Sequence, residues 1–185
     1  MPANRPDQIM LVETDPALAE VLAESIAPRL DAQITRAASA EAALDTDLFE
    51  PHDAFIGRLD LPGLDGLELA ARILAVRRRP FFLIGDALSA PQAIHALRLG
   101  VNGFFTKPFD LADLLDSLDL TLYAYNEARR QQRRQRQLRQ LVRRVVRQRR
   151  DLNSRMDLIC RDLVQAHRRL VSRVLAQESR PRESV

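Results

Sequence analysis

Short apolar runs alternate with helical patterns along the first 110 residues. Apolar residues recur every three or four positions between these runs, and Asp15, Ser39 and Ser89 stand where helix N-caps are expected. The runs have the length of buried strands and lie at residues 8–12, 32–36, 53–57, 80–84 and 101–105. Near-continuous apolar strands joined by helices predict a five-stranded parallel sheet covered on both faces, in the doubly wound α/β class.

A different pattern follows, because no Gly or Pro occurs from Phe109 to Arg180. One long helix is therefore predicted. Heptads counted from Thr121 give a seam of a and d positions that is mostly apolar from Leu138 to Leu170, with Arg149 as the one break, which is typical of a coiled coil. We define its predicted dimerisation residues as the apolar stripe: Leu138, Val142, Val145, Leu152, Met156, Ile159, Leu163 and Leu170.

The length of this helix favours a homodimer. A helix of about 100 Å cannot bury such a stripe within its own chain. The alternative is a hairpin or bundle, in which Asp151–Ser154 opens a second helix. The pattern leaves the parallel or antiparallel direction of two paired helices open.

Charge divides the chain in the same way as the hydrophobic pattern. Residues 1–128 carry a net charge of −10 and residues 129–185 a net charge of +13, although the whole chain has only +3. We predict an α/β domain at 1–120, an Arg-rich helical coiled-coil dimerisation segment at 121–178 and a disordered tail at 179–185. The asymmetry indicates that the basic part meets an acidic partner.

Several classes of protein are disfavoured by the composition. No apolar run approaches the roughly 18 residues of a membrane span, and the N-terminus lacks the apolar stretch of a signal peptide. The single cysteine, Cys160, cannot form an internal disulfide. We therefore expect a cytoplasmic protein without a membrane partner.

Three motifs resemble the receiver domain of two-component response regulators. They are Val12-Glu13-Thr14-Asp15-Pro16, Leu61-Pro62-Gly63-Leu64-Asp65-Gly66-Leu67-Glu68-Leu69, and the stretch from Gly100 to Lys107-Pro108-Phe109-Asp110. The resemblance covers roughly residues 8–120 and implies a flavodoxin-like sheet with strand order 2-1-3-4-5. It also implies an acidic pair that holds Mg²⁺, an Asp that accepts a phosphoryl group, a Ser or Thr, and a Lys.

Most of those family positions carry other residues in this chain. The degenerate phosphorylation-site positions are Glu13, Thr14, Arg58, Gly85, Phe104 and Lys107. Only Lys107 matches fully, and Arg58 stands where the acceptor Asp is expected. A guanidinium is not a nucleophile. We therefore expect a pseudo-receiver with no catalytic residues, metal or cofactor.

The role of Arg58 has two interpretations at this stage. It either pairs with Glu13 or Asp15 as a metal-free brace between strand ends, or it reaches solvent. Lys107 is expected to shape the turn before Pro108 and to pair with Asp15 or Glu13. Asp60, two residues beyond Arg58, is the candidate for a displaced phosphoryl acceptor.

Residues 129–150, called the basic segment below, contain eleven Arg and no acidic residue. This segment can bind nucleic acid, dock on an acidic protein surface or act as a solvated spacer. The candidate anion or nucleic-acid contacts are Arg133, Arg134, Arg136, Arg139, Arg143, Arg144 and Arg147.

Together these features predict a phosphorylation-independent, response-regulator-like signalling protein. We expect it to act by coiled-coil dimerisation and by contact with an unidentified signalling protein, without enzymatic activity. One alternative is a nucleic-acid-binding transcription or antitermination regulator that uses the basic segment. A second alternative is a phosphorylated response regulator with a displaced acceptor.

Overall fold

The computed structural model describes residues 6–178, except for the side chains of residue 167 and residues 170–178. The predicted tail at 179–185 and the side chain of Leu170 lie outside the described residues. The chain divides into two compact units, one ending at Arg129 and one starting at Arg130. Each unit is described by itself below.

Within the described residues, five parallel strands form one sheet in the order β2-β1-β3-β4-β5, as predicted. The strands are β1 (Asp7–Val12), β2 (Ala32–Ala37), β3 (Ala54–Arg58), β4 (Phe81–Gly85) and β5 (Gly103–Thr106). β5 begins two residues later than expected. The reason is that the Val101 N–H donates to the carbonyl of Ala96 at 3.0 Å, in the turn that closes the preceding helix.

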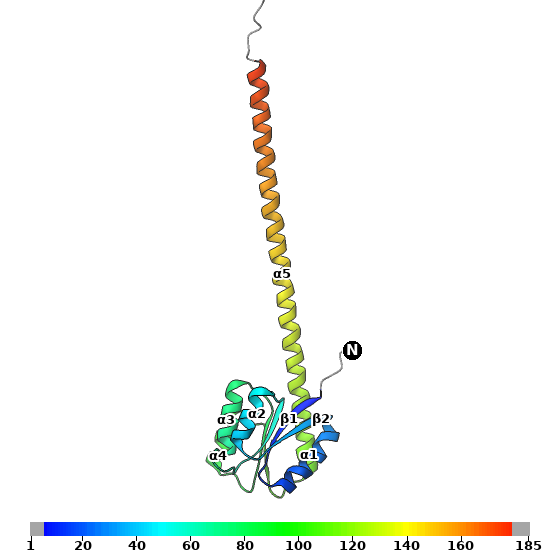
Figure 1. Cartoon of the computed structure of the whole chain (residues 1–185), viewed down its shortest axis with the longest axis vertical. Helices are drawn as coiled ribbons and strands as arrows, with labels where there is room; N and C mark the ends of the chain where they lie inside the picture. Colours follow the sequence, from blue (N-terminus) through cyan, green and yellow to red (C-terminus); the bar gives the residue numbers. More distant parts are fainter. Residues whose placement is uncertain (1–5, 179–185) are drawn as a thin grey trace, which may run out of the picture. The chain divides into compact units, whose positions relative to one another are not determined.

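The helices connect the strands as the sequence predicts (Figure 1). Side chains of Asp15, Ser39 and Ser89 cap three of them, and Gln92 completes a capping box with Ser89. The helices are α1 (Pro16–Leu30), α2 (Ala40–Phe49), α3 (Gly66–Val76), α4 (Ala90–Leu99) and α5 (Leu111–Glu178).

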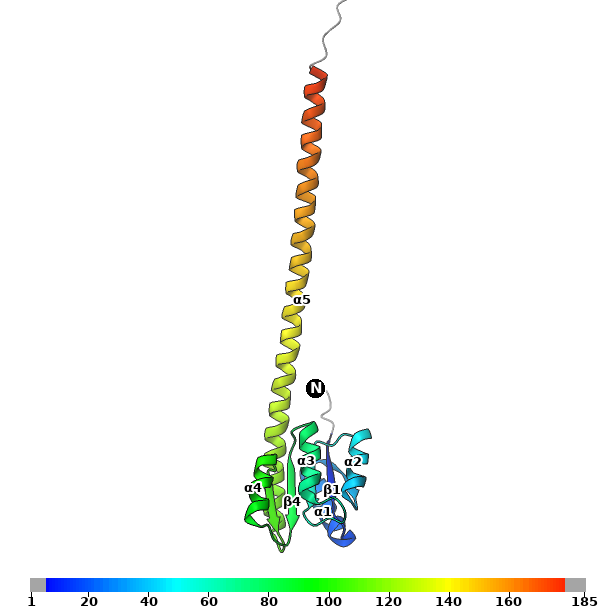
Figure 2. The same ribbon diagram turned by 90° about the vertical axis from the view of Figure 1, so that its left-hand side faces the viewer.

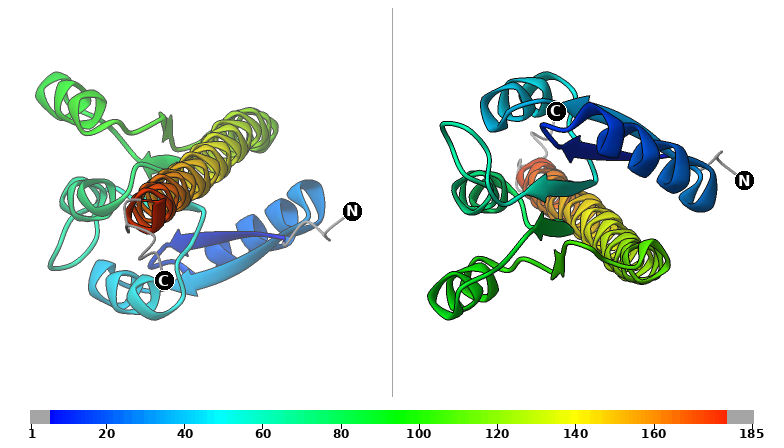
Figure 3. Two further views of the ribbon diagram at one scale, coloured as in Figure 1. Left: turned by 90° about the horizontal axis from the view of Figure 1, so that it is seen from above. Right: turned by 90° about the horizontal axis from the view of Figure 1, so that it is seen from below.

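The sheet separates two apolar layers because successive strand residues face opposite sides. Ile9 and Leu11 pack with α1 and with Leu114, Leu118 and Leu122 of α5. The alternate residues of β1 pack with α2, α3 and α4. Figure 2 shows these three helices on one face, and Figure 3 separates them from α1 and the start of α5. Side chains at the carboxyl ends of β1, β3 and β5 are thereby held on a rigid frame.

α5 runs without interruption through Asp151–Ser154. The described chain therefore does not form the hairpin considered as an alternative. From Leu138 to Leu163, each residue of the apolar stripe is between 58% and 64% exposed. Within the described residues, the chain itself does not cover the stripe.

Candidate functional site

Glu13 lies at the centre of a charged cluster at the carboxyl ends of the strands. Arg58 donates from Nη1 to Oε1 of Glu13 at 3.0 Å, and Lys107 donates from Nζ to Oε2 at 3.1 Å. The backbone N–H groups of Thr14 and Asp15 also donate to Oε1, at 2.9 and 3.1 Å. We call Glu13, Arg58 and Lys107 the Glu13 cluster. It joins β1, β3 and the turn after β5, where the Lys107–Pro108 peptide is cis.

The electrostatics of the cluster favour the ionised carboxylate. Burial by itself would raise the pKa of Glu13, whose side chain is 2% exposed. The N–H of Asp15, Arg58 and Lys107 outweigh burial and hold the pKa of Glu13 below its ordinary value. The hydrogen bond to Glu13 correspondingly raises the pKa of Arg58. The cluster is therefore a charged brace, with one anion held by two cations.

The neighbouring degenerate positions leave little room for a bound group. A Cβ on Gly85 would lie 3.0 Å from Cβ of Leu59 and 3.4 Å from the Phe104 ring. Phe104 is half-buried against the core formed with α2, α3 and α4. Thr14 is exposed, and its hydroxyl donates to Glu13 over 3.4 Å. A Ser or Thr side chain at position 85 would require Leu59 or Phe104 to move.

The residues present do not fit Mg²⁺. Mg²⁺ needs an octahedral set of oxygen ligands, usually including one or two carboxylates. Both Glu13 oxygens already accept hydrogen bonds from cations, and Arg58 brings positive charge to the acceptor position. The residues that the structure describes contain no group of three His, Cys, Asp or Glu positioned to hold a metal.

Two nearby acidic residues, Asp15 and Asp60, lie outside the Glu13 cluster. The Asp15 side chain caps α1 by accepting the N–H of Ala17 at 3.0 Å, so it is not the carboxylate that meets Arg58. Asp60 is exposed and lies beyond the end of β3, yet its charge, like that of Asp86, helps to raise the pKa of Arg58. Asp60 therefore adds to the negative charge around Arg58 without being a member of the Glu13 cluster.

A second charged cluster lies before the amino ends of β3 and β4, and sequence reasoning missed it. Arg79 donates to both carboxylate oxygens of Asp47, at 2.9 and 2.5 Å, and to the carbonyl of His52 at 2.7 Å. Its guanidinium lies 4.7 Å from the centre of the Phe55 ring. Arg77 also donates to the His52 carbonyl, at 2.7 Å. The three consecutive Arg at 77–79, directly before a buried strand, were the available signal.

The amino-terminal part of α5 is held to the domain by polar contacts as well as by its apolar face. Asn126 donates to both oxygens of Asp7, at 3.1 and 2.9 Å. Arg129 donates to Asp53 at 2.6 Å, and Arg77 lies 3.9 Å from the same oxygen. These contacts end where the first unit ends, at Arg129.

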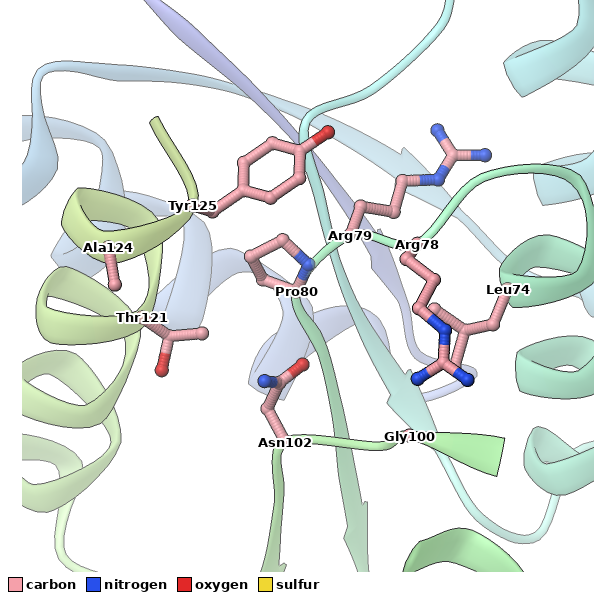
Figure 4. A pocket seen from close by; sticks show the side chains of 9 residues that line it. All are labelled: Leu74, Arg78, Arg79, Pro80, Gly100, Asn102, Thr121, Ala124 and Tyr125. Atoms are coloured by element: carbon pink, nitrogen blue, oxygen red, sulfur yellow. The ribbon is translucent and has the colours of Figure 1, made fainter. Parts of the chain in front are cut away.

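A cavity of about 280 Å³ lies near the amino end of β4 (Figure 4). Figure 4 shows Arg78 beside Leu74, while Arg79 extends away from Asn102. The amide oxygen of Asn102 accepts the N–H of Phe81 at 3.0 Å, so its polar group is already used by the fold. The lining residues are Leu74, Arg78, Arg79, Pro80, Gly100, Asn102, Thr121, Ala124 and Tyr125.

The candidate anion contacts of the basic segment are all exposed. They are Arg133, Arg134, Arg136, Arg139, Arg143, Arg144 and Arg147. Their side chains cover faces of α5 other than the apolar stripe, because they occupy heptad positions other than a and d. The structure therefore presents two separate surfaces on the second unit, one apolar and one cationic.

Fold and site together define a receiver-like α/β domain with an ion-paired cluster at the carboxyl ends of its strands. A family model described as the response regulator receiver domain matches residues 9–119. The chain belongs to this family of two-component signalling proteins.

Curated relatives support the same assignment. Response regulator ArlR of Staphylococcus epidermidis is 32% identical over 75 residues, which cover 40% of this chain and 34% of that protein. The transcriptional regulatory protein GlrR of Escherichia coli is 30% identical over 118 residues, which cover 63% of this chain and 26% of that protein. The chain thus spans about a third or a quarter of the length of these relatives.

Solved structures agree on the domain. The signal receiver domain of an HD domain-containing protein from Pseudomonas fluorescens has a TM-score of 0.62 and 25% identity, covering 66% of this chain and 99% of that one. A CheY-like receiver domain protein from Methanospirillum hungatei has a TM-score of 0.63 at 20% identity, covering 67% of this chain and 99% of that one, and shows the fold alone. In the described part of the chain, no helix is both long and apolar enough to span a membrane.

Proposed function

We propose that this chain is a phosphorylation-independent pseudo-receiver that signals through protein contacts and through a dimeric coiled coil. It acts in the cytoplasm, has no enzymatic activity and uses neither metal nor cofactor. Its activity follows from binding a signalling protein, or from its own abundance, instead of from phosphoryl transfer.

The observation that carries this proposal is the Glu13 cluster. In a phosphorylated receiver, the carboxyl ends of the strands must bind a metal ion and expose a nucleophilic Asp. Here Arg58 and Lys107 donate to opposite oxygens of Glu13. The motif resemblance puts Arg58 where the nucleophilic Asp is expected, and the pairing of Arg58 and Lys107 with Glu13 neutralises this carboxylate without a metal ion.

The exposed apolar stripe supports dimerisation as the output. Side chains such as Val142 and Ile159 are more than half exposed in the single chain. Full burial of a Val, Leu, Ile or Met side chain stabilises an assembly by about 1.5–3 kcal/mol before the entropy of association is subtracted. A second helix that covers the stripe would remove this apolar surface from water.

Sedimentation velocity of the full chain, with and without Mg²⁺ and acetyl phosphate, tests both parts of the proposal. We expect a dimer whose dissociation constant is the same in both conditions. The double substitution Val142→Asp and Val145→Asp should weaken dimerisation at least 100-fold, while Gln140→Asp on the outer face should leave it within threefold. A monomeric full chain, or a dimer that forms only with the phosphodonor, would contradict the proposal.

Nucleic-acid binding is the second candidate, and the exposed arginines of the basic segment favour it. Eleven Arg without an acidic neighbour in residues 129–150 form a charge density suited to phosphate backbones. Binding to a non-specific DNA duplex and to a single-stranded RNA should be measured from about 50 to 200 mM salt, because phosphate contacts weaken steeply in that range. Absence of binding at the lowest salt concentration would remove this candidate.

A further inference from the structure

The apolar stripe and the charges around it select a direction for the paired helices. We propose that two copies of α5 pair antiparallel, with residues 138–163 of one copy lying along residues 163–138 of the other. This inference rests on the proposed dimerisation through the stripe and adds the identity and orientation of the occupant, a second copy of this chain.

Charge along α5 is uneven over the length of the stripe. Residues 133–150 contain nine Arg and no acidic residue, whereas residues 151–168 contain three Arg and three Asp. Paired helices lie about 8–10 Å apart, which is close to the screening length of about 8 Å at physiological salt. A parallel pair sets nine cations beside nine cations at the same level. An antiparallel pair sets each group of nine beside a stretch with no net charge.

Arg149 supplies a second, independent reason. It occupies an a position of the seam and is exposed in the single chain. In a parallel pair in register, an a residue faces the same residue of the other helix, so two guanidinium groups would meet inside the seam. In an antiparallel pair, a faces d, and Arg149 meets Leu152 of the second copy. Its long aliphatic stem can then cover that leucine while the charged end reaches water.

The antiparallel register centred between Arg150 and Asp151 also fills the remaining layers with apolar pairs. Leu138 then faces Leu163, Val142 faces Ile159 and Val145 faces Met156 of the second copy. In this register, every described residue of the stripe faces a residue of the second helix. The midpoint of the stripe therefore coincides with the boundary between the cationic and the neutral halves of the helix.

The arginines themselves do not fill this seam. Most of them occupy b, c and f heptad positions, which point away from a paired helix. An acidic protein or a nucleic acid would therefore contact the outer faces of α5 and would leave the stripe uncovered. The second copy is the occupant whose surface matches both the length of the stripe and its charge boundary.

Spin-label distances in the full chain test the orientation. The single cysteine is replaced by Cys160→Ser, and labels are placed at Gln140→Cys in one protein and Gln165→Cys in another, both on outer faces. In any antiparallel register, the axial separations 140–140 and 165–165 add up to at least about 75 Å, at 1.5 Å per residue. For the proposed register they are about 32 and 44 Å.

Mixing the two labelled proteins gives the reciprocal measurement. The proposal predicts that position 140 of one copy lies within about 6 Å axially of position 165 of the other. A parallel pair instead places these two positions about 38 Å apart and keeps each identical pair at the interhelical distance. That pattern would overturn the antiparallel proposal but leave dimerisation intact. Loss of all dipolar coupling, together with a monomeric mass, would overturn both.

Discussion

Arg58 and Glu13 form an ion pair of 3.0 Å that joins the ends of β3 and β1. The motif resemblance leads us to expect the phosphoryl acceptor of the family at the position of Arg58 and a metal ligand at that of Glu13. In this chain the two residues pair directly with each other. Lys107 completes the arrangement at 3.1 Å.

Replacing Glu13 with Gln should destabilise the domain. The change leaves Arg58 and Lys107 facing each other without their shared anion. Breaking a buried ion pair costs about 3–5 kcal/mol, and because the two cations are partly solvated we expect about 2 kcal/mol here. Chemical denaturation of the full chain measures it. Glu24→Gln, at an exposed carboxylate of α1, is the matched control, and equal stability of both variants would contradict the brace.

The pH dependence of stability should report the same carboxylate. The folded pKa of Glu13 lies below its ordinary value of about 4.5, so the unfolded chain binds the proton more readily. The stabilisation is therefore fully present above about pH 4.5 and is lost as the pH falls through the lowered folded pKa. The stability difference between wild type and Glu13→Gln, measured from pH 7 to 3, should stay constant near neutrality and shrink in acid. If the stability difference grew in acid instead, the folded pKa of Glu13 could not be lowered.

Among the arginines of the domain, substitution of Arg79 should lower the free energy of unfolding the most. Its removal leaves the half-buried Asp47 without a two-point partner and takes away one of the two arginine donors to the His52 carbonyl. We expect Arg79→Met to lower the free energy of unfolding by about 3 kcal/mol. Arg78→Met, at the adjacent exposed position, is the matched control and should cost less than about 1 kcal/mol. Similar losses in both variants would contradict the role assigned to Arg79.

Replacing Gly85 with Ala should destabilise the domain. An added Cβ would lie 3.0 Å from Cβ of Leu59, and overpacking of this kind costs about 1–3 kcal/mol. Gly57→Ala is the matched control, because its Cβ would reach the Phe81 ring at an ordinary 3.4 Å. Thermal unfolding should show a clear loss for Gly85→Ala only. A neutral Gly85→Ala would mean that the family hydroxyl could be accommodated here.

The sequence predicted the parts of the molecule that depend on local pattern. Apolar runs and caps such as Asp15 and Ser39 follow from short-range chemistry, and the resemblance to receiver domains implied the strand order. The choice between a paired and a solvated Arg58 could not be made, because it depends on how β1 and β3 align in space. Asp47 and Arg79 are 32 residues apart, so no spacing rule relates them. Val101 was assigned to a strand because its carbonyl and N–H partners cannot be read from its apolar character.

Intact mass of the full chain after incubation with Mg²⁺ and acetyl phosphate shows whether the domain can be phosphorylated, with a receiver that has the complete site as the positive control. We expect an unchanged mass, because Arg58 cannot accept a phosphoryl group. A covalent phosphoryl adduct on the wild-type chain that disappears in Asp60→Asn would contradict this expectation and would establish a displaced acceptor.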